Sequence, residues 1–443
     1  MVLENAFEIV RVRGRMILDS RGDPTVEVEV YTRGGGVGRA AAPAGASRGR
    51  HEAVELRDGG KEWNGKGVER AVRIVNSIIA PALIGLDSRM QREVDSVLVK
   101  LDGTREKRVL GGNAIVATSL AVAKAAAATA GLPLYRYIGG PRAYVLPVPM
   151  LNIINGGAHA GNELSFQEFM ILPVGATSFR EAMRMAVEIY KELKRVLVDK
   201  YGKMAVNVGD EGGYAPPMRE NREALDALVE AVKRAGYEPG VDIVFALDVA
   251  ASQVYDEGKK RYIVDGKELD RSGMIEYLIK LIDEYPIASV EDPLYEEDFE
   301  GFAEFTREAS KRGVLVVGDD LYTTNPERLA EGIRRGASTA VLVKVNQVGT
   351  LTEALEVVTM AHRAGMKAII SHRSGETEDT TIAHLAVGLA TGLIKTGAPA
   401  RGERTAKYNE LLRIEEELGE EAYYPGVQAV KPGEPIRFPP LLP

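Results

Sequence analysis

The hydrophobic pattern of the chain changes in character near residue 140. Before that point, apolar and polar residues alternate as in half-buried antiparallel strands, over residues 9–18, 25–31 and 37–42. Apolar residues then recur at helical spacing, over residues 68–79, 88–99 and 113–130. A run of strands followed by helices is typical of an α+β domain. We predict such a domain over residues 1–140.

Beyond residue 140 the pattern becomes one of short apolar runs separated by amphipathic helical stretches. Runs such as 243–247 and 314–318 are continuously apolar, whereas residues 351–363 carry apolar positions at helical spacing. Alternating strands and helices indicate a parallel α/β barrel, here over residues 141–426. The remaining residues, 427–443, contain five prolines and are expected to be extended or disordered.

Each buried run in the second part ends in an ionisable residue. These residues are, in chain order, Asp248, Glu291, Asp319, Lys344, His372 and Lys395. The carboxyl ends of the strands of such a barrel meet at one mouth, so we expect these six side chains to surround one pocket. The three acids follow consecutive strands, and converging carboxylates without cysteine are the ligands that Mg²⁺ prefers.

Lys344 is the anomaly within this pattern. The segment 341–346 (VLVKVN) otherwise has the composition of a buried strand. A buried ammonium group is costly unless it is paired or loses its proton, and a neutral lysine is a base near neutral pH. Two interpretations therefore stand for Lys344, a catalytic base and an inert residue in a salt bridge.

Two glycine-bearing loops of the barrel part carry further polar side chains. Residues 155–162 (NGGAHAGN) contain His159, and residues 207–214 (NVGDEGGY) contain Glu211. Neither loop has the spacing of a phosphate-binding or dinucleotide-binding fingerprint. Taken alone, His159 could be an ordinary polar residue and Glu211 part of a solvated turn.

A third loop of this kind lies in the first domain. Residues 43–52 (PAGASRGRHE) combine small residues with Ser47, two arginines and a histidine. Small residues let a loop move and let its backbone approach a ligand, so a mobile lid over an anionic ligand is one interpretation. An ordinary glycine turn is the other.

Composition narrows the class of protein. With 443 residues, 45% hydrophobic and 27% charged, the chain is long enough for a barrel beside a smaller domain. The net charge of −8 argues against a nucleic-acid partner, and the absence of cysteine excludes disulfides. Residues 114–132 are mostly alanine with Lys124 inside, which favours a buried helix over a membrane span. The N-terminal residues lack the basic-then-apolar pattern of a signal peptide, so we expect a cytoplasmic enzyme.

Seven segments resemble the signatures of the enolase family. They are residues 43–52, 155–162, 208–214, 289–293, 342–350, 371–380 (SHRSGETEDT) and 394–401 (IKTGAPAR). The resemblance implies an α+β cap and a modified TIM-type barrel with two strands and two helices before the regular units. It also implies a glycolytic and gluconeogenic hydro-lyase that converts 2-phosphoglycerate to phosphoenolpyruvate with two Mg²⁺ ions per active site. Ala44 and Arg48 replace the more usual serine and threonine of the family's lid.

The resemblance further implies a role for each candidate residue. Lys344 removes the C2 proton of the substrate and Glu211 protonates the departing hydroxide. Three acids hold the first Mg²⁺, namely Asp248, Glu291 and Asp319. Ser47 helps to bind the second ion. The residues that bind or support the substrate and the acid are Ser47, His159, Gln167, Glu168, His372, Arg373, Ser374 and Lys395.

Other functions stay open at the level of sequence. A member of the same superfamily that acts on an acid sugar or an amino acid would use the same barrel without Arg373-Ser374 and the lid. A non-catalytic protein on this fold would have lost some of Glu211, Lys344 and the three acids. For partners, the resemblance implies a phosphorylated small molecule and a symmetric homo-oligomer, either a dimer or an octamer built from dimers. An additional binding role of the outer surface also stays open.

Overall fold

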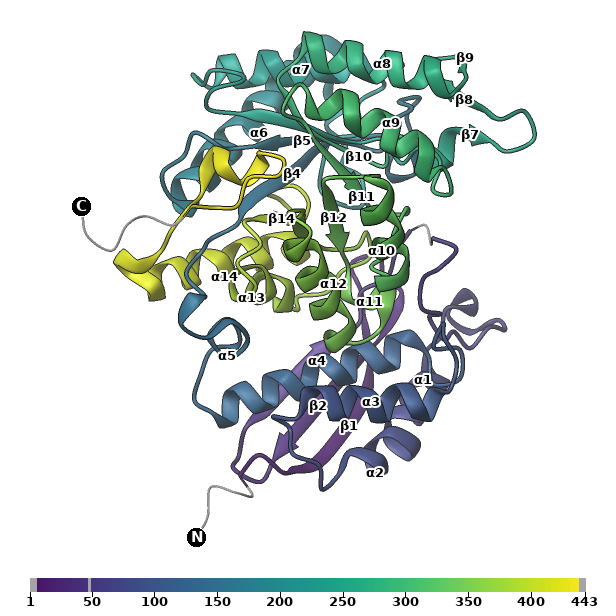
Figure 1. Cartoon of the computed structure of the whole chain (residues 1–443), viewed down its shortest axis with the longest axis vertical. Coiled ribbons are helices and arrows are strands. Elements are labelled where there is room, and N and C mark those ends of the chain that lie inside the picture. Colours follow the sequence, from purple (N-terminus) through teal and green to yellow (C-terminus); the bar gives the residue numbers. More distant parts are fainter. Residues whose placement is uncertain (1–5, 47–48, 438–443) are drawn as a thin grey trace.

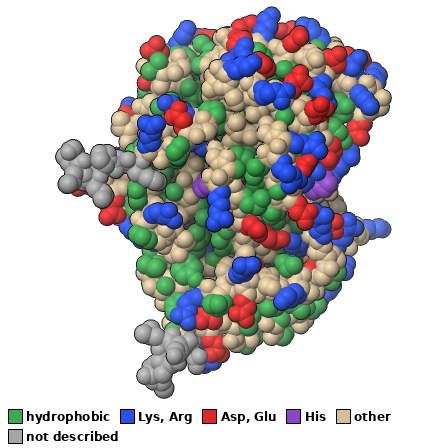
Figure 2. Space-filling model, in the orientation of Figure 1, with side chains coloured by type: hydrophobic (Ala, Val, Ile, Leu, Met, Phe, Trp, Pro, Cys, Tyr) green, Lys and Arg blue, Asp and Glu red, His purple; other side chains and the backbone are tan. Residues whose placement is uncertain are grey.

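The computed structural model describes residues 6–46 and 49–437, except for the side chain of His159 (Figure 1). Ser47 and Arg48 of the predicted lid lie outside the described residues. The chain forms a smaller α+β part, purple to blue in Figure 1, and a larger barrel, teal to yellow. On the face shown in Figure 2, basic and acidic side chains are interspersed over both parts.

The first part is built on a three-stranded antiparallel sheet of β1 (Ile9–Leu18), β2 (Pro24–Thr32) and β3 (Val37–Ala41), as predicted. Alternation along β2 puts Val26, Val28 and Val30 on one fully buried face, which packs against α4 (Gly112–Thr129). Gly38 permits the close approach, because a Cβ atom there would lie 2.0 Å from the carbonyl oxygen of Ala121.

The other helices of this part differ in detail from the predicted ranges. They are η2 (Glu62–Gly65), α1 (Glu69–Ile74), η3 (Val75–Ile79), α2 (Ala80–Leu83), α3 (Gln91–Asp102), α5 (Leu134–Gly139) and η4 (Gly140–Arg142). The predicted helix 68–79 changes to π-helical hydrogen bonding at Val75. The predicted helix 88–99 begins only at Gln91, because residues 87–90 form a turn closed by a bond from Met90 N to Asp87 O (3.0 Å).

The alanine-rich segment is a buried helix, as predicted. Every residue of α4 from Gly112 to Ala123 is buried, against the sheet and against the helices beside it. Among residues 6–46 and 49–437, no single helix is long and apolar enough to cross a membrane.

The second part is a closed eight-stranded barrel. Its strands are β4 (Val148–Asn155), β5 (Glu168–Leu172), β6 (Val244–Asp248), β10 (Ile287–Glu291), β11 (Leu315–Gly318), β12 (Ala340–Val343), β13 (Lys367–Ser371) and β14 (Leu393–Lys395). Neighbouring strands are parallel except at β5, which is antiparallel to both β4 and β6. The fold class predicted from the sequence is therefore confirmed, including its irregular first units.

Helices cover the outside of the barrel. They are α6 (Phe179–Tyr201), α7 (Asn221–Arg234), α8 (Arg271–Glu284), α9 (Phe299–Ser310), α10 (Pro326–Arg335), α12 (Leu351–Arg363), α13 (Thr381–Gly388) and α14 (Gly402–Leu418). Two helices, α6 and α7, follow β4 and β5 before the regular alternation begins. Short helical turns and a small sheet fill the connections: η5 (Gly157–His159), η6 (Lys203–Val206), η7 (Ala251–Val254), and β7 (Tyr255–Asp256), β8 (Arg261–Val264) and β9 (Lys267–Leu269).

The segment around Lys344 is not one continuous strand, so that prediction is wrong in detail. Strand β12 ends at Val343, and α11 (Val345–Val348) begins directly after Lys344. The backbone N–H of Lys344 donates to Thr324 Oγ1 (2.9 Å) instead of to a neighbouring strand. A hydrophobic run cannot show where pairing stops, because β12 and α11 are equally buried.

The beginning of the proline-rich tail is helical, contrary to expectation. After η8 (Gly419–Glu421), residues Gly426–Val430 form the 3-10 helix η9, in which Ala429 and Val430 are buried. The ammonium group of Lys367 donates to the carbonyl oxygens of Gln428 (3.2 Å) and Glu434 (2.6 Å), which anchors the tail to the barrel.

Candidate active site

The ionisable residues at the strand ends lie around one cavity. Asp248, Asp319, Lys344, His372 and Lys395 line it, and Glu291 reaches it through contact with Lys395. Gln167, Glu168, Glu211, Arg373 and Ser374 also line it. Glu168 stands at this mouth because β5 runs against its neighbours, which brings its first residue beside the last residue of β6, Asp248. Ser47 and the side chain of His159 lie outside the described structure.

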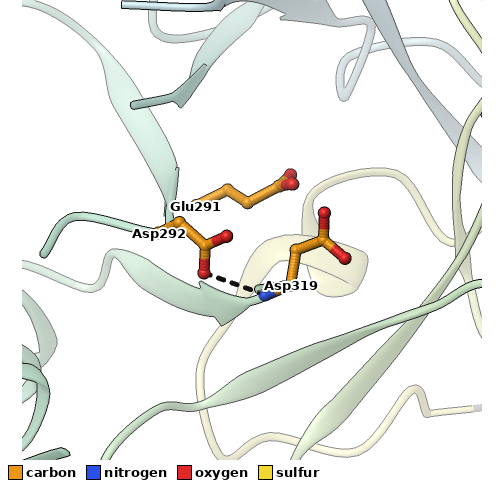
Figure 3. Close-up of side chains that lie close together, drawn as sticks. All are labelled: Glu291, Asp292 and Asp319. Carbon is orange, nitrogen blue, oxygen red and sulfur yellow. Dashed lines mark hydrogen bonds between the residues drawn. The ribbon is translucent and has the colours of Figure 1, made fainter. Parts of the chain in front are cut away.

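Three buried acids lie close together (Figure 3), and two of them, Asp292 and Asp319, line the cavity. Carboxylate oxygens of Glu291, Asp292 and Asp319 all lie within 4.8 Å of one another. The carboxylate of Asp292 accepts from the backbone N–H groups of Asp319 (3.0 Å) and Asp320 (2.8 Å), so it orients the loop that carries Asp319. Asp292 is not among the site residues predicted from the sequence, although it directly follows a strand-end acid, and Asp248 is not a member of this cluster.

Burial and neighbouring charges shift the pKa values of these acids in opposite directions. Burial, reinforced by the charge of Asp248, holds the pKa of Glu291 well above its usual range. Burial also raises the pKa of Asp319, but the ammonium group of Lys344 outweighs it and the net pKa is lowered. Glu291 Oε1 has no hydrogen-bond donor among the described residues. Buried carboxylates with a spare oxygen fit a hard divalent cation.

Lys395 supplies positive charge to the neighbouring acids. Its Nζ lies 2.8 Å from Glu291 Oε2, 3.1 Å from Asp248 Oδ2 and 3.2 Å from Glu168 Oε2. Burial lowers the pKa of Lys395, but these carboxylates outweigh it and leave the pKa well above its ordinary value. Lys395 is therefore a charged group in this site.

Lys344 is paired with one of the acids. Its Nζ lies 2.5 Å from Asp319 Oδ2, and 13% of its side chain is exposed. Burial lowers the pKa of Lys344, but Asp319 outweighs burial and the net pKa is raised. This direction is opposite to the one expected from burial of the lysine alone, because the sequence does not reveal which carboxylate lies beside it.

Arg373 is held by Glu52, which is not among the site residues predicted from the sequence. Its Nη1 donates to Glu52 Oε2 (3.0 Å) and to Asn346 Oδ1 (3.2 Å). Glu52 also accepts from Gln347 Nε2 (3.2 Å), and the same amide nitrogen lies 3.2 Å from Asp319 Oδ1. The end of the predicted lid, Arg373 and the acidic cluster thus belong to one hydrogen-bonded network.

Glu211 is buried in the site, not in a solvated turn. Its side chain is 3% exposed, and Oε2 accepts from Asn152 Nδ2 (2.9 Å). The same oxygen lies 3.5 Å from His372 Nε2. Burial lowers the pKa of His372 to about 4, so its imidazole is neutral near pH 7. Glu211 therefore faces the cavity beside an uncharged histidine.

Glu168 and Gln167 occupy the side of the cavity formed by β5 and β6. Gln167 Nε2 donates to Asp248 Oδ2 (3.3 Å), and Gln253 Nε2 donates to Gln167 Oε1 (2.7 Å). Burial and then the charge of Glu211 raise the pKa of Glu168 well above its usual range. Two carboxyl groups in one dry site favour a shared proton.

Fold and site together define a capped α/β-barrel enzyme whose mouth combines buried acids with two lysines. A model described as the enolase N-terminal domain matches residues 9–138, and one described as the enolase C-terminal TIM barrel domain matches residues 143–433. The chain belongs to the enolase family, as its sequence signatures indicate.

Three relatives illustrate the similarity. The enolases of Thermococcus gammatolerans and Pyrococcus furiosus are each 61% identical over 424 residues, which covers 96% of this chain and 98% of theirs. The enolase of Methanocaldococcus jannaschii is 60% identical over 421 residues, which covers 95% of this chain and 98% of its own. The similarity therefore extends through both the cap and the barrel.

Proposed function

We propose that this chain is a phosphopyruvate hydratase, a lyase that reversibly dehydrates 2-phospho-D-glycerate to phosphoenolpyruvate in glycolysis and gluconeogenesis. The observation that carries the proposal is the arrangement of Lys344 and Glu211, which line one cavity together with the acids at the ends of β6 and β11. A base and an acid on one small cavity are what β-elimination of water requires.

The acid and base roles follow from the chemistry of the two side chains. Lys344 takes the proton from C2 of the substrate, which lies next to the carboxylate, as the neutral amine. A bound cation that held Asp319 would remove the contact that raises the pKa of Lys344, whereas burial and the charges of Arg373 and Lys395 lower that pKa. The Glu211 carboxyl group gives a proton to the hydroxyl that leaves from C3. Asn152 donates to the Glu211 carboxylate and His372 lies beside it, and Glu168 and Gln167 support this side of the cavity.

The acids at the strand ends are the proposed ligands of Mg²⁺. Asp248, Glu291 and Asp319 would hold the first of two ions, with Asp292 orienting Asp319, and Ser47 would help to bind the second. When bound, two divalent cations stabilise the extra negative charge that forms on the substrate carboxylate as the proton leaves. Lys395 adds a fixed positive charge beside the same acids.

The substrate-binding residues supply donors for a carboxylate and a phosphate. Arg373 offers a planar fork suited to two oxygens of one oxyanion, and further donors around it would come from His159, His372, Ser374 and Lys395. The cavity between these groups has a volume of about 30 Å³, too small for a phosphorylated three-carbon acid. Arg373 is ion-paired with Glu52 (3.0 Å), so a substrate that binds to Arg373 would have to compete with this contact.

The test is an assay for phosphoenolpyruvate formation from 2-phosphoglycerate, with Mg²⁺ and with a chelator. We expect turnover that depends on Mg²⁺. An acid-sugar or amino-acid substrate turned over in its place would indicate another member of the superfamily, and no turnover of any of these would indicate a binding protein. We also propose a cytoplasmic homodimer, and light scattering that finds only monomers at micromolar concentration would contradict the dimer.

A further inference from the structure

Arg404, a buried arginine on α14, contacts two segments of the proposed active site. It lies in the first turn of α14, and its side chain is fully buried. Its Nη1 donates to His372 Nδ1 and to Arg373 O, each at 2.6 Å. Its Nη2 donates to Asp210 O (3.0 Å) and to Ser374 O. One guanidinium group thus joins the segment after β13 to the loop that carries Glu211.

The partners of Arg404 are unusual for a buried cation. The carboxylate of Glu403 lies 3.6 Å from Arg404 Nε, too far for a hydrogen bond, and Nε has no acceptor among the described residues. The acceptors are three carbonyl oxygens and one imidazole nitrogen. An apolar side chain could fill such a volume at lower desolvation cost, but it could not supply several donors in one plane.

The contact with His372 determines which ring nitrogen carries the proton. A guanidinium group has donors and no acceptor, so the Nδ1 atom that it contacts must be the unprotonated nitrogen. The proton of the neutral ring is then on Nε2, which lies 3.5 Å from Glu211 Oε2. Reversal of the tautomer would place a lone pair against the Glu211 carboxylate and two donors against each other at Nδ1.

Neighbouring contacts make the Glu211 loop depend on α14. Arg401, just before α14, donates from Nη1 to Gly209 O (3.0 Å), and Ala398 N donates to Glu211 O (3.0 Å). Gly397 has φ +85°, and a Cβ atom there would lie 2.8 Å from Glu211 O and 2.9 Å from Arg404 Cδ. The backbone around Arg404 and Glu211 is therefore closely packed, with little room for another arrangement.

We propose that Arg404 is a positioning residue for the acid step: it holds His372 as the Nε2–H tautomer and fixes the Glu211 loop against the segment 372–374. The inference rests on the proposed role of Glu211 as the acid. Arg404 does not line the cavity and is assigned no contact with substrate. Its loss should therefore impair departure of the hydroxyl while the base Lys344, on another loop, still removes the C2 proton.

The first measurement uses the wild-type protein. The chain has five histidines, so ¹⁵N-histidine labelling, with His372→Gln to assign the signal, gives the tautomer of His372 directly. We expect a protonated Nε2 and an unprotonated Nδ1 at pH 7. A protonated Nδ1, in either the other tautomer or the imidazolium form, would overturn the proposal, and this result does not depend on the identity of the substrate.

The second measurement compares variants. Arg404→Met should lower phosphoenolpyruvate formation by about 10²-fold or more, while exchange of the C2 proton with solvent stays within about threefold of wild type. Arg404→Lys keeps the charge but not the planar fork, so its rate of phosphoenolpyruvate formation should lie between those of wild type and Arg404→Met. The matched control is Arg413→Met on the same helix, whose side chain is 68% exposed.

Each outcome bears on the proposal. Equal loss of exchange and turnover in Arg404→Met, or full wild-type behaviour of Arg404→Lys, would overturn it. If Arg404→Met does not fold, Arg404→Lys and the wild-type spectrum decide the question. Wild-type protein without either exchange or turnover would refute the proposed function itself, and the spectrum would still show whether Arg404 sets the tautomer.

Discussion

The ammonium group of Lys395 lies 2.8 Å from the carboxylate of Glu291, in a place where both side chains are essentially removed from solvent. Asp248 and Glu168 share the same ammonium group at 3.1 Å and 3.2 Å. When all three are ionised, these carboxylates carry more charge than one lysine balances, and burial and the neighbouring acids accordingly raise the pKa of Glu291 and of Glu168. A divalent cation would balance the ionised site.

Replacement of Lys395 should expose this imbalance. Lys395→Met removes the shared counter-charge, so we expect the free energy of unfolding to fall by about 3–5 kcal/mol in chelator. Mg²⁺ should restore part of the loss, because a bound cation stabilises the same carboxylates. Urea unfolding with and without Mg²⁺ measures both values, and Lys194→Met, on the exposed face of α6, is the control. An identical loss in both buffers would argue against a cation at these acids.

Asp319 should be sensitive to the concentration of Mg²⁺. Asp319→Asn replaces a charged ligand by a neutral one, so we expect turnover to fall by about 10–100-fold and to recover partly as Mg²⁺ is raised. Steady-state rates across a Mg²⁺ titration test this. Asp283→Asn, at an exposed ion pair with Arg312, should leave the titration unchanged. Full activity of Asp319→Asn at low Mg²⁺ would remove Asp319 from the ligand set.

The two proposed proton-transfer residues should be separable by isotope exchange. Lys344→Ala should nearly abolish both turnover and exchange of the C2 proton with solvent deuterium. Glu211→Gln should retain exchange while phosphoenolpyruvate formation falls by about 10²–10⁴-fold, because the base remains and the acid is lost. Mass spectrometry of recovered substrate measures the exchange. The reverse pattern would require the roles of the two residues to be exchanged.

His372 should contribute to the pH dependence of stability. Burial lowers its pKa in the folded protein from 6.5 to about 4, so between these values the unfolded chain binds a proton that the folded protein does not. The free energy of unfolding therefore falls as pH falls from about 6.5 to about 4, and this histidine contributes up to about 3 kcal/mol to the decline. Urea unfolding between pH 7 and pH 4.5 should show a smaller decline in His372→Gln than in wild type. Parallel declines would mean that His372 is protonated in the folded protein.

Local sequence information was sufficient for much of the architecture. Alternation along β1, β2 and β3 gave their ranges to within a residue or two, because each strand buries part of its surface against helices, β2 and β3 against α4 and β1 against α1, η3 and α2. The strand-end positions of Asp248, Glu291 and Lys395 also followed from the ends of the hydrophobic runs. The hydrophobic pattern did not give helix boundaries such as the start of α3, or the end of β12 before Lys344. Burial alone does not show which backbone groups are hydrogen-bonded.

The sequence by itself determined the strand and helix order, the set of ionisable residues at the barrel mouth and the family, because these depend on local patterns and on motifs within single segments. Only the tertiary structure decided which of these side chains lie beside one another. Asp319 beside Lys344, Glu52 beside Arg373 and Arg404 beside His372 each join residues at least 25 positions apart. Charge interactions fall off over a few ångströms of space, whatever the separation in sequence, so the direction of the Lys344 pKa and the tautomer of His372 follow only from the folded barrel.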